Sequence, residues 1–110
     1  MIMKISCPIW NCSIQMARQK QIHVTVEGFV QGVGFRFFVF QLGKSRGLKG
    51  WVRNRINGSV EIVAQGDADD LKFLLEELER GPQIAQVSKV NTEWSDELED
   101  LPSFTVLTTN

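Results

Sequence analysis

The chain has 110 residues, a formal net charge of −1, and hydrophobic and charged fractions of 43% and 23%. This is the size of one domain, large enough to bury a core without disulfides or metal. Nucleic-acid-binding proteins usually carry a basic excess or a basic stripe, and this chain has neither. No stretch has the uninterrupted apolar length of a membrane span. We therefore expect neither nucleic acid nor a membrane among its partners.

The first residues differ in character from the rest of the chain. Both cysteines, Cys7 and Cys12, lie there, and their spacing without further ligands is a weak metal signal, so the sequence assigns them no role. A proline and polar residues break any apolar run that a signal peptide would need. We expect residues 1–15 to be an appendage, disordered or preceding the natural start, and residues 16–110 to form the domain. That domain has no cysteine, which favours a cytoplasmic protein.

Two elements with different periods open the domain. Apolar and polar residues alternate over residues 21–27, which predicts a half-buried strand. His23, the single histidine, falls on the polar side, where we expect it to face solvent rather than to act in catalysis. Apolar residues then recur at i, i+3, i+4 and i+7 from Phe35, the spacing of an amphipathic helix of about three turns. Phe37 and Phe40 lie off this stripe. They are either partly exposed or widen the packed face, and we expect the second.

A glycine-rich stretch, Gly28-Phe-Val-Gln-Gly-Val-Gly-Phe-Arg36, joins this strand to this helix. Glycine permits backbone conformations and close approaches that a Cβ would block. A helix N-terminus leaves unpaired N–H donors and a partial positive charge. Such a loop, with the forked cation of Arg36 beside it, suits a phosphate or a carboxylate. The alternative is that Arg36 is an ordinary surface arginine.

Strands and one more helix follow. Extended segments are predicted at residues 48–54, 59–64, 84–94 and 104–107. Asn57-Gly58 indicates a tight hairpin turn between the first two of them, and Gly66 should end the second. Asp67 suits the cap of a helix with one stripe of leucines, which Gly81-Pro82 ends.

The predicted order is β-α-β-β-α-β with a short extra C-terminal strand. Each helix has a single apolar stripe, so both should cover one face of an antiparallel sheet. This is an α+β fold, the ferredoxin-like α/β sandwich, which names no function by itself.

An RNA-binding domain of this topology needs aromatic residues on its third strand, and residues 59–64 have none. Without a Cys-x-x-Cys motif or a histidine cluster, we expect no metal ion.

Two motifs in fixed order resemble the acylphosphatase family. They are the glycine-rich stretch ending at Arg36 and Gly47-Leu-Lys-Gly-Trp-Val-Arg-Asn54, which Asn57-Gly-Ser-Val-Glu61 follows. The similarity runs from about Gln21 to Val106. It implies hydrolysis of acyl phosphates to a carboxylate and inorganic phosphate, without metal or cofactor. It places the family's catalytic residues on Arg36 and Asn54, and its phosphate-binding loop on Phe29, Val30, Gln31, Gly32, Val33 and Gly34.

A mechanism follows from this resemblance. The carboxylate of an acyl phosphate leaves without protonation, so no strong general acid is needed. Loop N–H groups and the Arg36 guanidinium would hold the phosphoryl group, and Asn54 would orient the attacking water. Two residues depart from the family pattern: Gly43, where alanine is common, and Arg46, where leucine is frequent. Glycine inside a helix should cost up to about 1 kcal/mol of stability.

Two alternatives to a free enzyme stay open. One is a non-catalytic module of the same fold that binds a phosphate or a carboxylate. The other is a partner-dependent domain, since similar segments occur inside larger carbamoyl-transfer maturation proteins. Taken alone, Asn54 is also explained as a residue that leads into a turn. For the enzyme, we expect a monomer whose partners are a small acyl phosphate, which the sequence does not identify, and inorganic phosphate as product.

Overall fold

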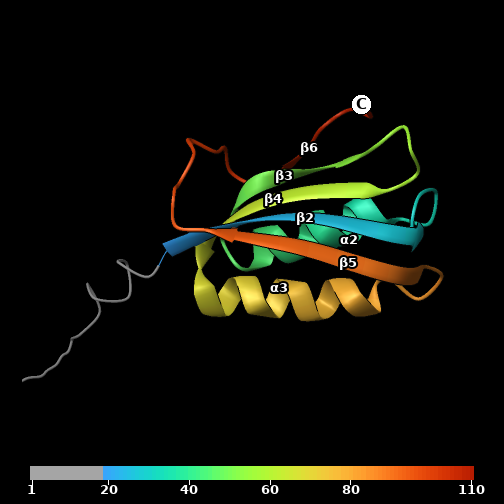
Figure 1. Cartoon of the computed structure of the whole chain (residues 1–110), viewed down its shortest axis with the longest axis horizontal. Coiled ribbons are helices and arrows are strands. Elements are labelled where there is room, and N and C mark those ends of the chain that lie inside the picture. Colours follow the sequence, from blue (N-terminus) through green and yellow to red (C-terminus); the bar gives the residue numbers. More distant parts are fainter. Residues whose placement is uncertain (1–18) are drawn as a thin grey trace, which may run out of the picture.

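The computed structural model describes residues 19–110, so the expected appendage at residues 1–15 and both cysteines lie outside the described part of the chain. The described residues form a five-stranded sheet with two helices against one face (Figure 1). The elements are β2 (Gln19–Phe29), α2 (Phe35–Ser45), β3 (Lys49–Asn54), β4 (Val60–Asp67), α3 (Ala68–Arg80), β5 (Gln86–Ser95) and β6 (Thr105–Val106). The ferredoxin-like α+β fold expected from the sequence is confirmed.

The strand order brings two distant loops to one end of the sheet. The strands follow the order β5-β2-β4-β3-β6. Both β2 and β3 pair antiparallel with β4, so they run parallel to each other on its two sides. Their carboxyl-terminal ends therefore lie together, and the loop after β2 and the hairpin after β3 meet there (Figure 1).

The last strand departs from the antiparallel expectation, because β6 pairs parallel with β3. The chain leaves β5 at the end of the sheet where β3 begins, and the loop between β5 and β6 crosses that end (Figure 1). A strand that enters the β3 edge from there runs in the direction of β3. The residues after β6 continue along β3, where Asn110 N donates to Asn54 O at 3.1 Å.

The core lies between the sheet and the helices. One face of the central strands and the apolar stripes of both helices are buried, as the two sequence periods predict. Fully burying one such side chain contributes about 1.5–3 kcal/mol of transfer free energy. The core residues are Ile22, Val24, Val26, Val30, Phe35, Val39, Leu48, Val52, Val60, Ile62, Ala64, Leu71, Leu74, Leu78 and Phe104.

The predicted strand boundaries lie within two residues of the observed ones, except at Gly66. As predicted, Asp67 caps α3 by accepting from Asp69 N at 2.9 Å, and Gly81, with φ of +69°, follows its last residue. Gly66 does not end the strand predicted at residues 59–64, because the observed strand β4 continues to Asp67. The Leu48 side chain packs where a Gly66 side chain would lie, with its Cδ2 2.4 Å from an ideal Cβ. The glycine there serves packing rather than a turn.

The hairpin between β3 and β4 is present as predicted but has a longer loop. Arg55 N donates to Ser59 O at 2.8 Å, and Gly58 N donates to Arg55 O at 3.1 Å. Gly58 has φ of +97°, which matches a three-residue loop with glycine at the left-handed position. This loop places the Arg55 and Ser59 carbonyls side by side at the base of the hairpin.

Candidate active site

The loop between β2 and α2 depends on glycine conformations. Gly32 and Gly34 have φ of +75° and +81°, values at which other residues are strained. Helix α2 begins directly after Gly34, which supplies no side-chain cap. The N–H groups of its first turn therefore have no helical acceptor, and they carry the positive end of the helix dipole. This end of α2 favours an anion.

The register of the sheet brings Asn54 to this loop. Val60 of β4 lies opposite Val26 on one side and Asn54 on the other. Residues directly opposite in antiparallel strands point to the same face, so Asn54 points to the face that the helices cover. Asn54 is 8% exposed, and its Oδ1 is buried without a hydrogen-bond partner among the described residues. A buried amide oxygen of this kind is costly and indicates a position that a ligand or a water completes.

Arg36 and Asn54 line one cavity of about 330 Å³. Arg36 is the second residue of α2, and no carboxylate within residues 19–110 forms an ion pair with it. A guanidinium without a carboxylate partner, next to free N–H donors, favours an anionic ligand. The lining residues are Val30, Gly32, Gly34, Phe35, Arg36, Phe37, Asn54 and Val106.

The predicted phosphate-binding loop divides into two groups. Val30, Gly32 and Gly34 line the cavity together with the two predicted catalytic residues. The other three point elsewhere: Phe29 is 58% exposed, Val33 packs against the core, and the Gln31 amide hydrogen-bonds to the hairpin. The cavity wall is thus formed by alternate residues of the loop.

Two apolar residues at the cavity were not found from the sequence. Phe37 was expected in the core, and this was wrong: it is 61% exposed beside Arg36, whereas Phe40 packs against the core as expected. The place of Phe37 off the apolar stripe was the available signal. Val106 reaches the cavity because β6 runs parallel to β3, and no sequence signal indicated that edge pairing.

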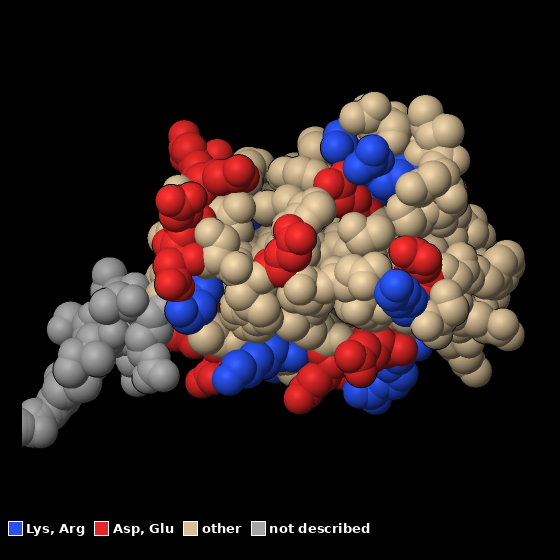
Figure 2. Space-filling view, viewed as in Figure 1, with Lys and Arg blue, Asp and Glu red and all other residues tan. Residues whose placement is uncertain are grey.

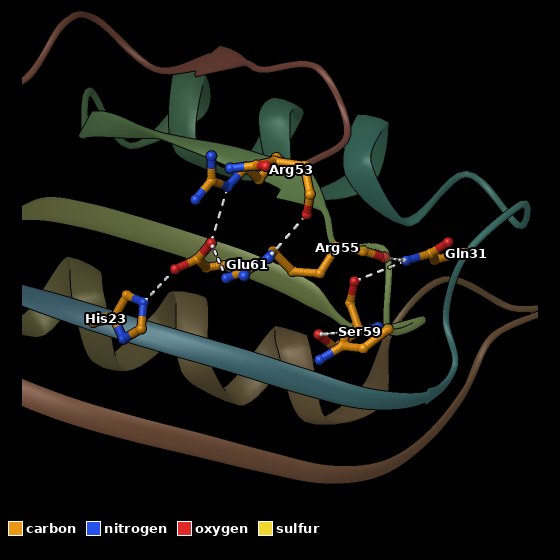
Figure 3. A network of polar contacts seen from close by, with 8 residues as sticks. His23, Gln31, Arg53, Arg55, Ser59 and Glu61 are labelled. Atoms are coloured by element: carbon orange, nitrogen blue, oxygen red, sulfur yellow. Dashed lines mark hydrogen bonds and ion pairs between the residues drawn. The ribbon is translucent and has the colours of Figure 1, made fainter.

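The open face of the sheet carries a buried carboxylate, that of Glu61 (Figure 3). Glu61 of β4 accepts from Arg53 Nε at 2.9 Å and Arg55 Nη1 at 3.0 Å, and its Oε2 lies 2.6 Å from His23 Nε2. Burial raises the pKa of Glu61, but the hydrogen bonds from these three partners outweigh burial, so the pKa lies below its ordinary value. His23 is half-exposed on the polar face as predicted, with the added role of a Glu61 partner.

The loop of the chain that is richest in acidic residues lies away from the cavity. Figure 2 shows acidic side chains gathered on the loop between β5 and β6. This loop contains Asp96, Glu97, Glu99 and Asp100, and it crosses the end of the sheet where β3 begins. The cavity lies at the other end, beside Asn54, where β3 finishes. This separation suits an anionic ligand.

The only polar side chains among the residues that line the cavity in the described part of the chain are those of Arg36 and Asn54. Within residues 19–110, no three His, Cys, Asp or Glu side chains lie close enough together to hold a metal ion. In the same part of the chain, no helix is both long and apolar enough to cross a membrane.

Comparison with known proteins identifies the family. The family model for acylphosphatase matches residues 22–106. The chain belongs to the acylphosphatase family. The acylphosphatase of Moorella thermoacetica is 47% identical over 74 residues, which are 67% of this chain and 80% of the relative. That of Geobacillus thermodenitrificans is 42% identical over 88 residues, 80% of this chain and 94% of the relative.

A solved acylphosphatase structure supports the same assignment. The structure of an acylphosphatase from Coxiella burnetii matches with a TM-score of 0.80 and 42% sequence identity, covering 87% of this chain and 100% of that one. The resemblance inferred from the two sequence motifs is therefore confirmed.

Gly43 departs from the acylphosphatase pattern, and packing explains it. An ideal Cβ on Gly43 would lie 2.6 Å from Cγ of Phe104 and under 3.0 Å from both ring Cδ atoms. Phe104, just before β6, is 2% exposed. The glycine thus lets an aromatic ring pack directly on the α2 backbone. Burial of that ring offsets the helix-propensity cost expected from the sequence.

Arg46, the second departure from the acylphosphatase pattern, connects the two helices. Its guanidinium carbon lies 3.7 Å from the ring centroid of Phe73 in α3, and its Nη1 lies 3.3 Å from Asp70 Oδ1. A cation over an aromatic face contributes about 0.5–1 kcal/mol at exposed sites. Arg46 therefore makes a cation–π contact where the family often has a leucine side chain.

Proposed function

We propose that this chain hydrolyses acyl phosphates to a carboxylate and inorganic phosphate in the cavity that Arg36 and Asn54 line. Membership of the acylphosphatase family supports this activity: the chain is a hydrolase that acts on acyl phosphates. One observation carries the assignment of the site. Asn54 and Arg36 line the same cavity, and among residues 19–110 the buried Oδ1 of Asn54 has no hydrogen-bond partner and Arg36 has no ion-pair partner.

We assign binding of the phosphoryl group to the glycine loop and Arg36. The N–H groups of the loop and of the first turn of α2 can donate to its oxygens, and the helix dipole adds positive potential. The planar guanidinium of Arg36 can donate two parallel hydrogen bonds. Charge on the equatorial oxygens of the transition state is stabilised by such fixed donors more than charge in the ground state.

We assign the attacking water to Asn54. A water that donates a hydrogen bond to Oδ1 would satisfy the buried oxygen and direct a lone pair toward phosphorus. The water oxygen forms a bond to phosphorus, the bond from phosphorus to the acyl oxygen breaks, and the carboxylate leaves with the electron pair. The proton that the water loses stays on inorganic phosphate. No step needs a strong general acid, a metal or another cofactor.

Hydrolysis of benzoyl phosphate by the purified chain, with and without EDTA, tests the proposal. We expect turnover that EDTA leaves unchanged. Inorganic phosphate that binds while benzoyl phosphate is not hydrolysed would favour the non-catalytic binding module instead. We further propose that the chain acts as a monomer in the cytoplasm. Sedimentation velocity on the full chain tests the monomer, and a stable dimer would contradict it.

A further inference from the structure

Gln31 lies in the glycine loop, but its side chain is hydrogen-bonded to the hairpin between β3 and β4 (Figure 3). Its Nε2 donates to Arg55 O at 2.7 Å and to Ser59 O at 2.9 Å. An amide group carries two N–H donors, and both are used on these adjacent carbonyls. The two bonds fix the position and the rotation of the Gln31 side chain relative to the hairpin base.

The hairpin base is a firm anchor, since other contacts hold it independently. Asn57 Oδ1 accepts from Ser59 N at 3.0 Å and from Ser59 Oγ at 2.7 Å. On the open face, Glu61 holds the side chain of Arg55 at 3.0 Å. The backbone of Arg55 therefore has little freedom to follow the loop, and the loop is positioned against it.

The neighbours of the two bonded residues belong to the candidate active site. Gln31 stands between Val30 and Gly32, which line the cavity, and Arg55 directly follows Asn54. The amide of Gln31 thus connects the glycine loop to the hairpin. On each side, the bonded residue is the direct chain neighbour of a residue that lines the cavity. We propose that Gln31 is a positioning residue, which holds the glycine loop and Arg36 in register with Asn54. This inference rests on the proposed function.

Loss of this amide should affect catalysis more than folding. Arg55 O also accepts from Gly58 N, and Ser59 O also accepts from Arg55 N. Neither carbonyl is left without a partner when Gln31 is replaced, so the large penalty of an unpaired buried group does not arise. Phosphate binding should survive as well, because Arg36 and the first turn of α2 move with the loop.

Gln31→Met tests the inference, because it keeps the side-chain length and removes both donors. We expect kcat for benzoyl phosphate to fall by about 10- to 100-fold, the effect of a small misplacement of reacting groups. The inhibition constant of inorganic phosphate should change by less than about threefold. Gln31→Asn retains an amide but is one methylene shorter. Gln31→Asn should lower kcat by a smaller factor, again with little change in the inhibition constant of inorganic phosphate. It replaces Gln31→Met in the test if the methionine variant does not fold.

Gln65→Met is a matched control. Gln65 Nε2 also donates two hydrogen bonds, to Gln21 Oε1 at 3.1 Å and Glu99 O at 2.8 Å, near the opposite end of β4. We expect this variant to lower Tm and to leave kcat unchanged.

Three results would contradict the inference or its basis. A kcat of Gln31→Met within about threefold of wild type would remove the positioning role. A phosphate inhibition constant that rises in step with the loss of kcat would make Gln31 part of the phosphate-binding surface. A wild-type chain without turnover would overturn the proposed function itself.

Discussion

Asn54 occupies a position where an apolar side chain would be more stable. Its cross-strand partner Val60 and, beyond Val60, Val26 are fully buried and point to the same face. The Oδ1 of Asn54 is buried without a hydrogen-bond partner in the described chain, and such a group costs about 1–3 kcal/mol. Costs of this kind persist where the group is needed for function. Stability and activity should therefore separate at Asn54.

Asn54→Ala should lower kcat by about 100- to 1,000-fold, the range for removal of one preorganised polar group. Tm should stay the same or rise, because the variant removes a buried oxygen that has no hydrogen-bond partner among the described residues. Steady-state kinetics with benzoyl phosphate and a thermal melt measure both. The control is Asn91→Ala on the exposed face of β5, which should change neither. Near-normal kcat in Asn54→Ala would refute the water-orienting role.

We expect the contribution of Arg36 to catalysis to depend on the planar geometry of its guanidinium and not only on its positive charge. A lysine at this position keeps the charge but not the planar fork. We expect Arg36→Lys to lower kcat/KM by at least about 100-fold, comparable to loss of a preorganised donor. Arg80→Lys, at the exposed end of α3, is the matched control and should leave kcat/KM unchanged. Full activity of Arg36→Lys would show that a point charge is sufficient.

At the scale of elements, the N-terminus of α2 lies at the cavity, and the rest of the helix packs against the core. Its N-terminus follows a left-handed glycine and leaves N–H donors at the cavity. Further along, Gly43 contacts the Phe104 ring, and Arg46, just after the helix, contacts Phe73. These packing contacts hold the axis of α2 and hence the direction of its free N–H groups.

Gly43→Ala should destabilise the protein, although alanine is the better helix former. The helix-propensity gain is about 1 kcal/mol, whereas overpacking a core costs about 1–3 kcal/mol. We expect a net loss of about 1 kcal/mol, a fall in Tm of about 4–8 °C for a domain of this size. In a Phe104→Leu background the clash is relieved, and Gly43→Ala should then raise Tm. A rise in the wild-type background would contradict the packing explanation.

At the scale of the whole molecule, the sheet separates the cavity with Arg36 and Asn54 from the ion-pair network of Glu61. The helix-covered face ends in the cavity, while the open face carries the Glu61 network behind it (Figure 3). The loop rich in acidic residues lies at the far end of the sheet (Figure 2). The cavity is thus separated from Glu61 by the sheet and from this acidic loop by the length of the strands.

Glu61 should make stability depend on pH in the acidic range. Its pKa is lowered from the ordinary 4.5, so the folded state holds the ionised carboxylate more firmly than the unfolded chain does. This stabilisation is complete above that ordinary value and is lost as pH falls through the lowered folded pKa. Thermal melts of wild type and Glu61→Gln should therefore differ most at neutral pH and converge in acid. A difference that stays constant into strong acid would contradict this.

We propose that residues 1–15 contribute neither to the core nor to the site. The family match begins at residue 22, and the site residues lie within residues 30–106. Deletion of residues 1–15 should leave Tm and kcat unchanged, as measured by thermal melts and benzoyl phosphate hydrolysis. A large loss of either would show that this segment belongs to the working domain.

The sequence by itself determined the order of the elements and the ferredoxin-like class, and it predicted an anion-binding loop before Arg36. These features depend on local physics: the periods of apolar residues, the glycine conformations and the chemistry of a helix N-terminus. The prediction of Asn54 as a catalytic residue came from the motif resemblance, because residue types near a turn do not distinguish a catalytic amide from a structural one.

The tertiary structure decided which of these residues meet. The register of Asn54 opposite Val60 sets its depth beside the loop, and the parallel pairing of β6 adds Val106 to the cavity. Packing and side-chain direction also decided the exposure of Phe37 and the attachment of Gln31 to the hairpin. Each of these depends on contacts between elements, and no local pattern in a single chain encodes strand register or the partner of a side chain.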